Sequence, residues 1–261
     1  MRALDIAATG MQAQQLMVEV ISNNIANVNT TGFKAQRAEF QDLLYQNIRT
    51  PGDSSSDAGT IVPVGVQIGI GVKTAAVYRM GLQGNLTQTG NPLDLAVQGD
   101  GFFQVLQPNG TVAYTRAGSF QLNNSRQIVT ADGFLVQPSI TIPANTTSIT
   151  IDQTGQVQAQ VAGQVNPQIA GQLTLATFPN EAGLLAMGQN LLTETQASGT
   201  PTVGNPGTNS IGVLNQGFLE TSNVNIVNEI TNLITAQRAY EMNSKVIEAA
   251  DQMQQTLSNL H

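Results

Sequence analysis

The sequence predicts an α+β protein in which long N- and C-terminal helices form a coiled-coil-type domain and the middle forms an all-β domain, a sandwich or irregular barrel. Three observations predict this fold: apolar residues recur every seven positions at both ends, all 10 prolines lie between about 50 and 220, and short apolar segments alternate with turns there. The predicted domains are 1–34 with 218–261 (helical), 35–85 (a connecting region with an extended arm) and 86–217 (β).

The N-terminal helix is predicted from about residue 4 to residue 28, where a narrow apolar seam follows a seven-residue repeat. The seam consists of Leu4, Met11, Val18 and Ile25. Such a seam is typical of a helix that pairs with another in a coiled coil. The end of the helix is rich in asparagine, at Asn23, Asn24, Asn27 and Asn29. Capping explains about two of them, and hydrogen bonding to other chains is an equally good interpretation of the rest.

The C-terminal helix is predicted from about 223 to 259, with Thr221 or Ser222 as its N-cap. Its seam consists of Ile226, Leu233, Tyr240 and Ile247, with Ile230 beside it, and the stripe is widened by Val227, Ile234, Val246, Met253 and Leu257. At about 1.5 Å per residue the helix spans ~55 Å, which is long for a globular protein. The two helices either pair within one monomer or associate with other copies, and the overhang of the longer helix favours self-association.

The middle of the chain has the composition of short strands joined by turns. Residues 102–106 and 111–115 are strand-like, and Pro108-Asn109-Gly110 between them is a turn signal. Spacings of about 8–12 residues between such segments are typical of a sandwich or barrel. Before this domain, glycine and proline bracket a segment predicted to form the extended arm, with Arg49, Pro51, Pro63 and Gly65 as its marker residues.

Composition argues against most catalytic chemistry. The chain has no Cys and its one His is the last residue, so neither a thiolate nor a histidine site is available. Gly69-Ile70-Gly71 lacks the third glycine of a dinucleotide-binding motif, and Asp94 and Asp100 have no further support as a carboxylate pair. We therefore expect no enzyme activity and no catalytic, metal or cofactor site.

Charge and the N-terminus restrict the partners and the location. The net charge of −7 argues against binding nucleic acid or an anionic membrane. No Lys or Arg occurs from 127 to 237, which we interpret as a contact surface that tolerates no positive charge. Asp5, Thr9 and Gln12 interrupt any apolar signal segment, so we expect a cytoplasmic protein or one exported without a cleaved signal.

Four motifs resemble those of the flagellar rod and hook protein family. The N-terminal motif is residues 15–34, and the C-terminal motif is 221–225 together with 235–241. The middle motifs are 94–103 and 114–120, so the likeness covers essentially the whole chain in order. Within the family, 45–69 and 137–145 resemble the members that build the distal rod.

The resemblance implies a structural subunit of the bacterial flagellum basal body that passes through the flagellar type III export machinery. It implies polymerisation with itself into a hollow helical rod across the periplasm, which transmits torque from motor to hook. The implied neighbours are proximal rod proteins, hook and hook-junction subunits, and the surrounding peptidoglycan and outer-membrane ring proteins. Two alternatives remain: a proximal rod or hook subunit, and a secreted glycan-binding β protein, which exposed aromatic residues such as Tyr114 would favour.

Overall fold

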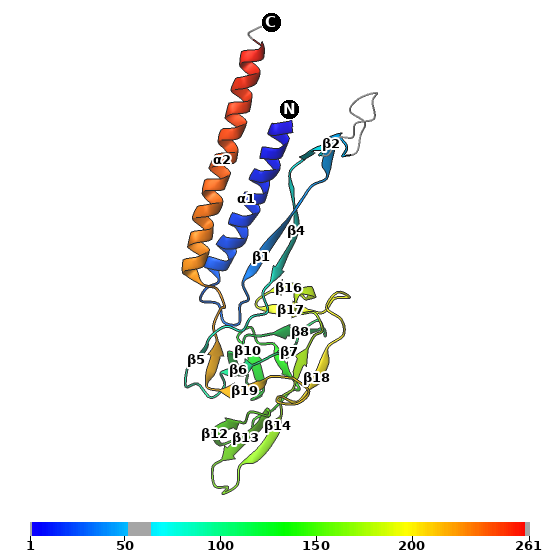
Figure 1. Cartoon of the computed structure of the whole chain (residues 1–261). Coiled ribbons are helices and arrows are strands. Elements are labelled where there is room, and N and C mark those ends of the chain that lie inside the picture. The colour runs from blue at the N-terminus through cyan, green and yellow to red at the C-terminus, as the bar shows by residue number, and fades with distance from the viewer. Residues whose placement is uncertain (1, 52–63, 259–261) are drawn as a thin grey trace. The chain divides into compact units, whose positions relative to one another are not determined.

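The computed structural model describes residues 2–51 and 64–258, where two α-helices flank a mostly β-stranded middle along the chain (Figure 1). This confirms the predicted α+β class. The chain divides into two compact units, a helical unit from the described residues of 1–25, 36–78 and 225–261, and a β unit of 26–35 and 79–224. In the described parts of the chain, no helix is long and apolar enough to cross a bilayer.

The helices are α1 (Arg2–Ala26) and α2 (Ile226–Ser258). The N-cap prediction for α2 was wrong, because Asn225 caps this helix: its Oδ1 accepts the backbone N–H of Asn228 at 3.2 Å. Thr221 lies in extended chain, where its N–H donates to the Asn85 carbonyl oxygen at 2.8 Å. The helix cap therefore lies three to four residues later than the sequence pattern indicated.

α1 and α2 approach each other closely within the helical unit. A Cβ atom added at Gly10 of α1 would lie 2.8 Å from Nδ2 of Asn243 on α2, so the absence of a side chain at Gly10 permits the approach. Small residues are buried on both helices, among them Ala7 on α1 and Ala236 and Ala250 on α2. The two helices therefore pack against each other within one chain through small residues that lie outside the predicted seams.

A long hairpin completes the helical unit. Strand β1 (Gln36–Asp42) pairs with β4 (Val72–Arg79), and β2 (Tyr45–Arg49) pairs with β3 (Val66–Gly69). The hairpin packs on α1, where the Val72 N–H donates to Thr9 Oγ1 at 3.3 Å. Gly69 and Gly71 lie in this hairpin, so the Gly-Ile-Gly segment is not the strand-to-helix turn of a nucleotide site.

The β unit contains one large sheet and several smaller ones. The large sheet runs in the order β16 (Leu185–Gly188), β17 (Leu191–Thr193), β8 (Val112–Thr115), β7 (Phe102–Leu106), β11 (Leu135–Gln137), β10 (Ile128–Thr130) and β9 (Phe120–Leu122). Beside this path, β15 (Leu175–Thr177) pairs with β7 and with β18 (Thr202–Gly204). The smaller sheets are β12 (Thr146–Ile151), β13 (Gln156–Val161) and β14 (Gln168–Gln172); β6 (Leu95–Gln98) with β19 (Val213–Gln216); and β5 (Leu86–Gln88) with β20 (Phe218–Glu220).

Phenylalanine and branched aliphatic side chains fill the core between these sheets. Phe103 and Phe120 meet edge to face with ring centroids 5.0 Å apart, and Leu95, Val97 and Leu175 are buried around them. Backbone also packs tightly here: a Cβ at Gly118 would lie 1.6 Å from the Leu95 carbonyl oxygen, so only glycine fits. This core holds the ends of the strands that carry the polar cluster described below.

Candidate functional site

The helix α2 exposes large apolar side chains along much of its length. Val227 is 72% exposed, and Met242 and Met253 are each 60% exposed. Ile226, Ile230, Ile234, Tyr240 and Val246 are also exposed. Isolated exposed apolar residues are ordinary, but eight of them on one helix, spread around more than half of its circumference, indicate a helix that has further partners. We call these eight residues the α2 apolar face.

Some residues of the predicted seams belong to this exposed set, and the others are half-buried. Half-buried positions are Leu4, Met11, Val18 and Ile25 on α1, and Leu233 and Ile247 on α2. Beside the seams, a groove of about 330 Å³ lies between the helices, lined by Gln15, Val18, Gln237, Tyr240 and Glu241. The structure therefore brings part of the predicted self-assembly set together and leaves Ile226, Ile230 and Tyr240 open to solvent.

The asparagines at the end of α1 have different surroundings. Asn24 is buried, and its amide exchanges two hydrogen bonds with the backbone of Gln36: Nδ2 donates to the carbonyl oxygen at 2.8 Å and Oδ1 accepts the N–H at 2.8 Å. Asn24 thus joins α1 to β1 within one chain. Asn27 Oδ1 accepts the Thr30 hydroxyl at 3.1 Å, and Asn23 is exposed.

The described marker residues of the predicted arm lie together at one end of the β2–β3 pair. Arg49 is opposite Val66, and a Cβ at Gly65 would lie 2.5 Å from the Arg49 carbonyl oxygen. Arg49 and Pro51 are exposed. Pro63 lies outside the described residues.

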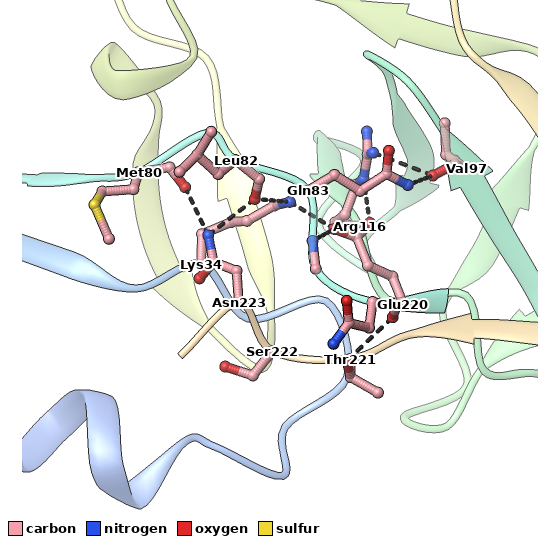
Figure 2. A network of polar contacts seen from close by, with 12 residues as sticks. Lys34, Met80, Leu82, Gln83, Val97, Arg116, Glu220, Thr221, Ser222 and Asn223 are labelled. Atoms are coloured by element: carbon pink, nitrogen blue, oxygen red, sulfur yellow. Dashed lines mark hydrogen bonds and ion pairs between the residues drawn. The ribbon is translucent and has the colours of Figure 1, made fainter. Parts of the chain in front are cut away.

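A buried polar cluster lies where three chain segments of the β unit meet (Figure 2). Glu220 at the end of β20 is 1% exposed, and its two carboxylate oxygens bind different cations. Oε1 accepts Lys34 Nζ at 2.6 Å and the Gly84 N–H at 2.9 Å, and Oε2 accepts Arg116 Nε at 2.6 Å. We call Lys34, Arg116, Glu220 and Asn223 the Glu220 cluster.

Backbone carbonyl groups accept further hydrogen bonds from both cations of the cluster. Arg116 donates to the carbonyl oxygens of Val97, Gly99 and Gly101, and its guanidinium carbon lies 5.9 Å from the ring centroid of Phe102. Lys34 Nζ also donates to the Leu82 carbonyl oxygen at 2.9 Å. Each cation therefore has an anionic partner and at least one carbonyl acceptor, which offsets the cost of removing its charge from water.

Asn223 joins the same three segments through its amide. Its Oδ1 accepts the Ala35 N–H at 2.7 Å, and its Nδ2 donates to the carbonyl oxygens of Met80 and Leu82 at 3.2 and 2.9 Å. The backbone adds further bonds between the segments, including the Met80 N–H to the Ala35 carbonyl oxygen at 2.8 Å. Residues 32–35, 80–84 and 220–223 thus form one hydrogen-bonded joint.

Burial and charge act in opposite directions on the pKa values of the cluster. Burial alone raises the pKa of Glu220, but the Arg116 charge and the hydrogen bonds from Arg116, Lys34 and Gly84 outweigh it, so this pKa is lowered. Burial lowers the pKa of Lys34 despite its contact with Glu220. Burial also raises the pKa of nearby Glu181, which Arg116 only partly offsets.

Other polar candidates have structural roles. Asp94 is buried and accepts the Thr89 hydroxyl at 2.6 Å and the Asn91 amide at 3.0 Å, whereas Asp100 is exposed. Tyr114 is buried, so it offers no aromatic platform for a sugar. Sequence reasoning missed the Glu220 cluster, because its ion pairs join residues 186 and 104 positions apart.

The fold, the exposed apolar side chains of α2 and the buried joint are features of a structural protein. Three segments match protein-family descriptions: residues 4–34 a "Flagella basal body rod protein", 96–159 a "Flagellar hook protein FlgE/F/G D1 domain", and 215–260 a "Flagellar basal body rod FlgEFG protein C-terminal".

Similar proteins extend over the whole chain. "Flagellar basal-body rod protein FlgG" of Caulobacter vibrioides is 61% identical, covering 100% of this chain and 99% of the relative. The protein of the same name from Bacillus subtilis is 40% identical, again covering 100% and 99%. "Flagellar hook-basal body complex protein FlhP" of Bacillus subtilis is 29% identical and covers 97% of each chain. The chain belongs to the flagellar basal-body rod protein family.

Proposed function

We propose that this chain is the structural subunit of the flagellar distal rod. Copies of it polymerise into a hollow helical tube in the basal body, and the tube transmits torque from the motor to the hook. The relatives named FlgG, similar along their full length, support this assignment over a proximal rod or hook subunit. Its neighbours are proximal rod proteins, hook and hook-junction subunits, and the ring proteins around the rod, after export by the flagellar type III machinery.

The α2 apolar face carries the proposal that the chain self-associates. Burying one large aliphatic side chain is worth about 1.5–3 kcal/mol, and Ile230 and Ile234 are close to half exposed in the single chain. Contact with neighbouring copies would bury the exposed half of these side chains along the helix. The terminal helices then form the inner, coiled-coil-type wall of the tube. The half-buried seam of α1 and the adjoining groove add to this surface.

Assembly of the purified full-length chain tests the proposal. Negative-stain microscopy of concentrated protein should show straight hollow tubes, and Ile234→Asp should raise the concentration needed for them about tenfold or more, because a carboxylate is then buried. Asn232→Asp is the matched control, since it adds the same charge at an exposed polar position two residues earlier in α2. Dispersed wild-type particles, or equal effects of both variants, would contradict the proposal.

The hairpin that contains Arg49, Pro51 and Gly65 is proposed to reach neighbouring copies as an extended arm. All five side chains of β2 are exposed, including Tyr45 and Ile48, which indicates that they need an external partner. Contacts by such an arm would stiffen the polymer. Tubes assembled from a chain lacking 50–65 should therefore bend more in micrographs, and tubes of unchanged stiffness would refute this role.

A further inference from the structure

Lys34 and Asn223 of the Glu220 cluster lie side by side, although they are far apart in the sequence. Lys34 Nζ and Asn223 Nδ2 both donate to the Leu82 carbonyl oxygen, each at 2.9 Å (Figure 2). The N–H of Ala35, the residue after Lys34, donates to Asn223 Oδ1 at 2.7 Å. These three hydrogen bonds hold a primary amine next to a side-chain amide.

The surroundings of Lys34 favour its neutral, nucleophilic form. Its side chain is 12% exposed, and burial lowers its pKa. The Arg116 charge lowers this pKa further, whereas Glu220 and Glu181 partly oppose the shift. Removal from water and a neighbouring cation are two ways in which proteins activate a lysine amine. Glu220 Oε1 lies 2.6 Å from Nζ, so a carboxylate that can accept a proton from the amine is already in contact with it.

The Asn223 amide is held in the way that attack by an amine requires. Negative charge develops on Oδ1 when a nucleophile adds to Cγ, and the Ala35 N–H already donates to this oxygen. The hydrogen bonds from Nδ2 to the carbonyl oxygens of Met80 and Leu82 fix the plane of the amide. Two reacting groups held in this way within one molecule do not need to meet by diffusion, which removes a large part of the entropic barrier.

We propose that Lys34 and Asn223 join through an isopeptide bond after the chain has folded. Glu220 Oε1 takes a proton from the Nζ ammonium group, and the lone pair of Nζ attacks Asn223 Cγ. The Cγ–Nδ2 bond then breaks, and Glu220 passes the two protons that Nζ loses to the departing nitrogen, which leaves as ammonium. Nζ keeps one hydrogen in the new amide, the Glu220 carboxylate is regenerated, and no oxidant or reductant is consumed. The reaction occurs once in each chain, so it is a self-modification and not an enzyme activity.

The bond closes the β unit covalently beside two of its connections to the helical unit. Lys34 comes just before the crossing at 35/36, and Asn223 comes just before the crossing at 224/225. A pull along the chain between residues 33 and 224 then passes through one covalent bond and does not unfold the strands between them. Ala35 and Asn223 are 188 positions apart in the sequence, so only the folded chain brings the reacting groups together. Until the bond forms, Lys34 remains the charged partner of Glu220.

Mass spectrometry of the folded full-length chain tests the bond. Incubation at neutral pH should lower the intact mass by about 17 Da, the mass of one ammonia. Succinimide formation at Asn109-Gly110 would remove the same mass, so a tryptic digest decides between the two reactions. Trypsin does not cleave after a bonded Lys34, so residues 3–37 should be recovered joined to residues 127–238. The unbonded chain yields residues 3–34 as a separate peptide.

Lys34→Arg is the most informative variant, because a guanidinium group keeps the positive charge beside Glu220 but does not lose a proton to become a nucleophile. Lys34→Arg and Asn223→Ala should each abolish the joined peptide. Glu220→Gln should slow its formation at least about tenfold, because the proton acceptor is lost. Lys245→Arg, which replaces an exposed lysine of α2, is the matched control and should form the bond as the wild type does. Circular dichroism checks that each variant is folded.

Folded wild-type protein that keeps its full mass, or that loses about 17 Da without giving the joined peptide, overturns the proposal. A joined peptide in Lys34→Arg overturns the assignment of the amine, and an unchanged rate in Glu220→Gln overturns the role of Glu220 in proton transfer. The measurement is made on single chains, so its outcome does not depend on whether the protein forms tubes.

Discussion

Replacing Glu220 by glutamine should remove a large part of the stability of the β unit. The carboxylate is 1% exposed and is the shared counter-charge of Lys34 and Arg116, at 2.6 Å from each. Removing one member of a buried ion pair costs about 3–5 kcal/mol, because the remaining charge stays buried without compensation. Glutamine keeps an oxygen that accepts the Gly84 N–H, so we expect the lower end, ~3 kcal/mol. That is a substantial fraction of the ~5–15 kcal/mol that stabilises a typical domain.

Urea unfolding of the full-length chain at neutral pH, with hydrogen exchange read on β-unit peptides, measures this loss. Asp132→Asn is the matched control, because it removes an exposed carboxylate and should change the unfolding free energy by less than about 0.5 kcal/mol. Lys34→Met in the Glu220→Gln background should recover part of the loss, since one uncompensated cation disappears. An unfolding free energy of Glu220→Gln equal to that of the control would refute the reasoning.

Acidification provides an independent test of the same carboxylate. The folded-state pKa of Glu220 is lowered, so its ionised form adds to the free energy of unfolding at pH values above the unfolded-state pKa, ordinarily 4.5. This contribution is lost as the pH falls through the lower folded-state pKa. Wild-type stability should therefore fall in that acidic window. Glu220→Gln should show a flatter dependence there, and identical slopes for the two proteins would contradict the sign of the shift.

Three further predictions concern single residues. Asn24→Leu removes both amide bonds to the Gln36 backbone and should destabilise the helical unit by about 2 kcal/mol, seen as faster hydrogen exchange at the start of β1. Gly118→Ala should cost more than about 3 kcal/mol or prevent folding, because its Cβ would overlap the Leu95 carbonyl oxygen, and soluble yield with circular dichroism reports this. Burial raises the pKa of Glu181, so its ionised form opposes folding; Glu181→Gln should raise the urea midpoint at neutral pH but not below its ordinary value of 4.5.

Periodicity predicted the helices because it reports which face of a segment is apolar, and that information is local. The sequence seam nevertheless understated the exposed surface: Met242 lies outside it and is 60% exposed, since the three-dimensional neighbours of a helix decide which apolar residues remain open. The start of α2 was misplaced for the same reason. Thr221 has the chemistry of an N-cap, but its pairing with Asn85 keeps it in extended chain.

The Glu220 cluster could not be predicted from one sequence, because nothing local to Lys34, Arg116 or Glu220 indicates their contact. In a sequence, a charged residue that is buried in the fold cannot be distinguished from one on the surface until its partner is known. Lys34 and Arg116 do lie in segments that resemble family motifs, which was the available signal, but Glu220 lies just before the C-terminal one. Long-range ion pairs of this kind become visible only once the pairing of β20 with β5 places Glu220 next to Gly84.

The location of the joint bears directly on the proposed transmission of torque. The chain crosses between its two units at 25/26, 35/36, 78/79 and 224/225. On the β-unit side of three of these crossings, residues 32–35, 80–84 and 220–223 are bound to one another through Glu220 and Asn223. A single flexible linker swivels under a twisting load, whereas segments fixed to each other must turn together. The ion pairs of Glu220 therefore hold three segments of the β unit to one another on the β-unit side of these crossings.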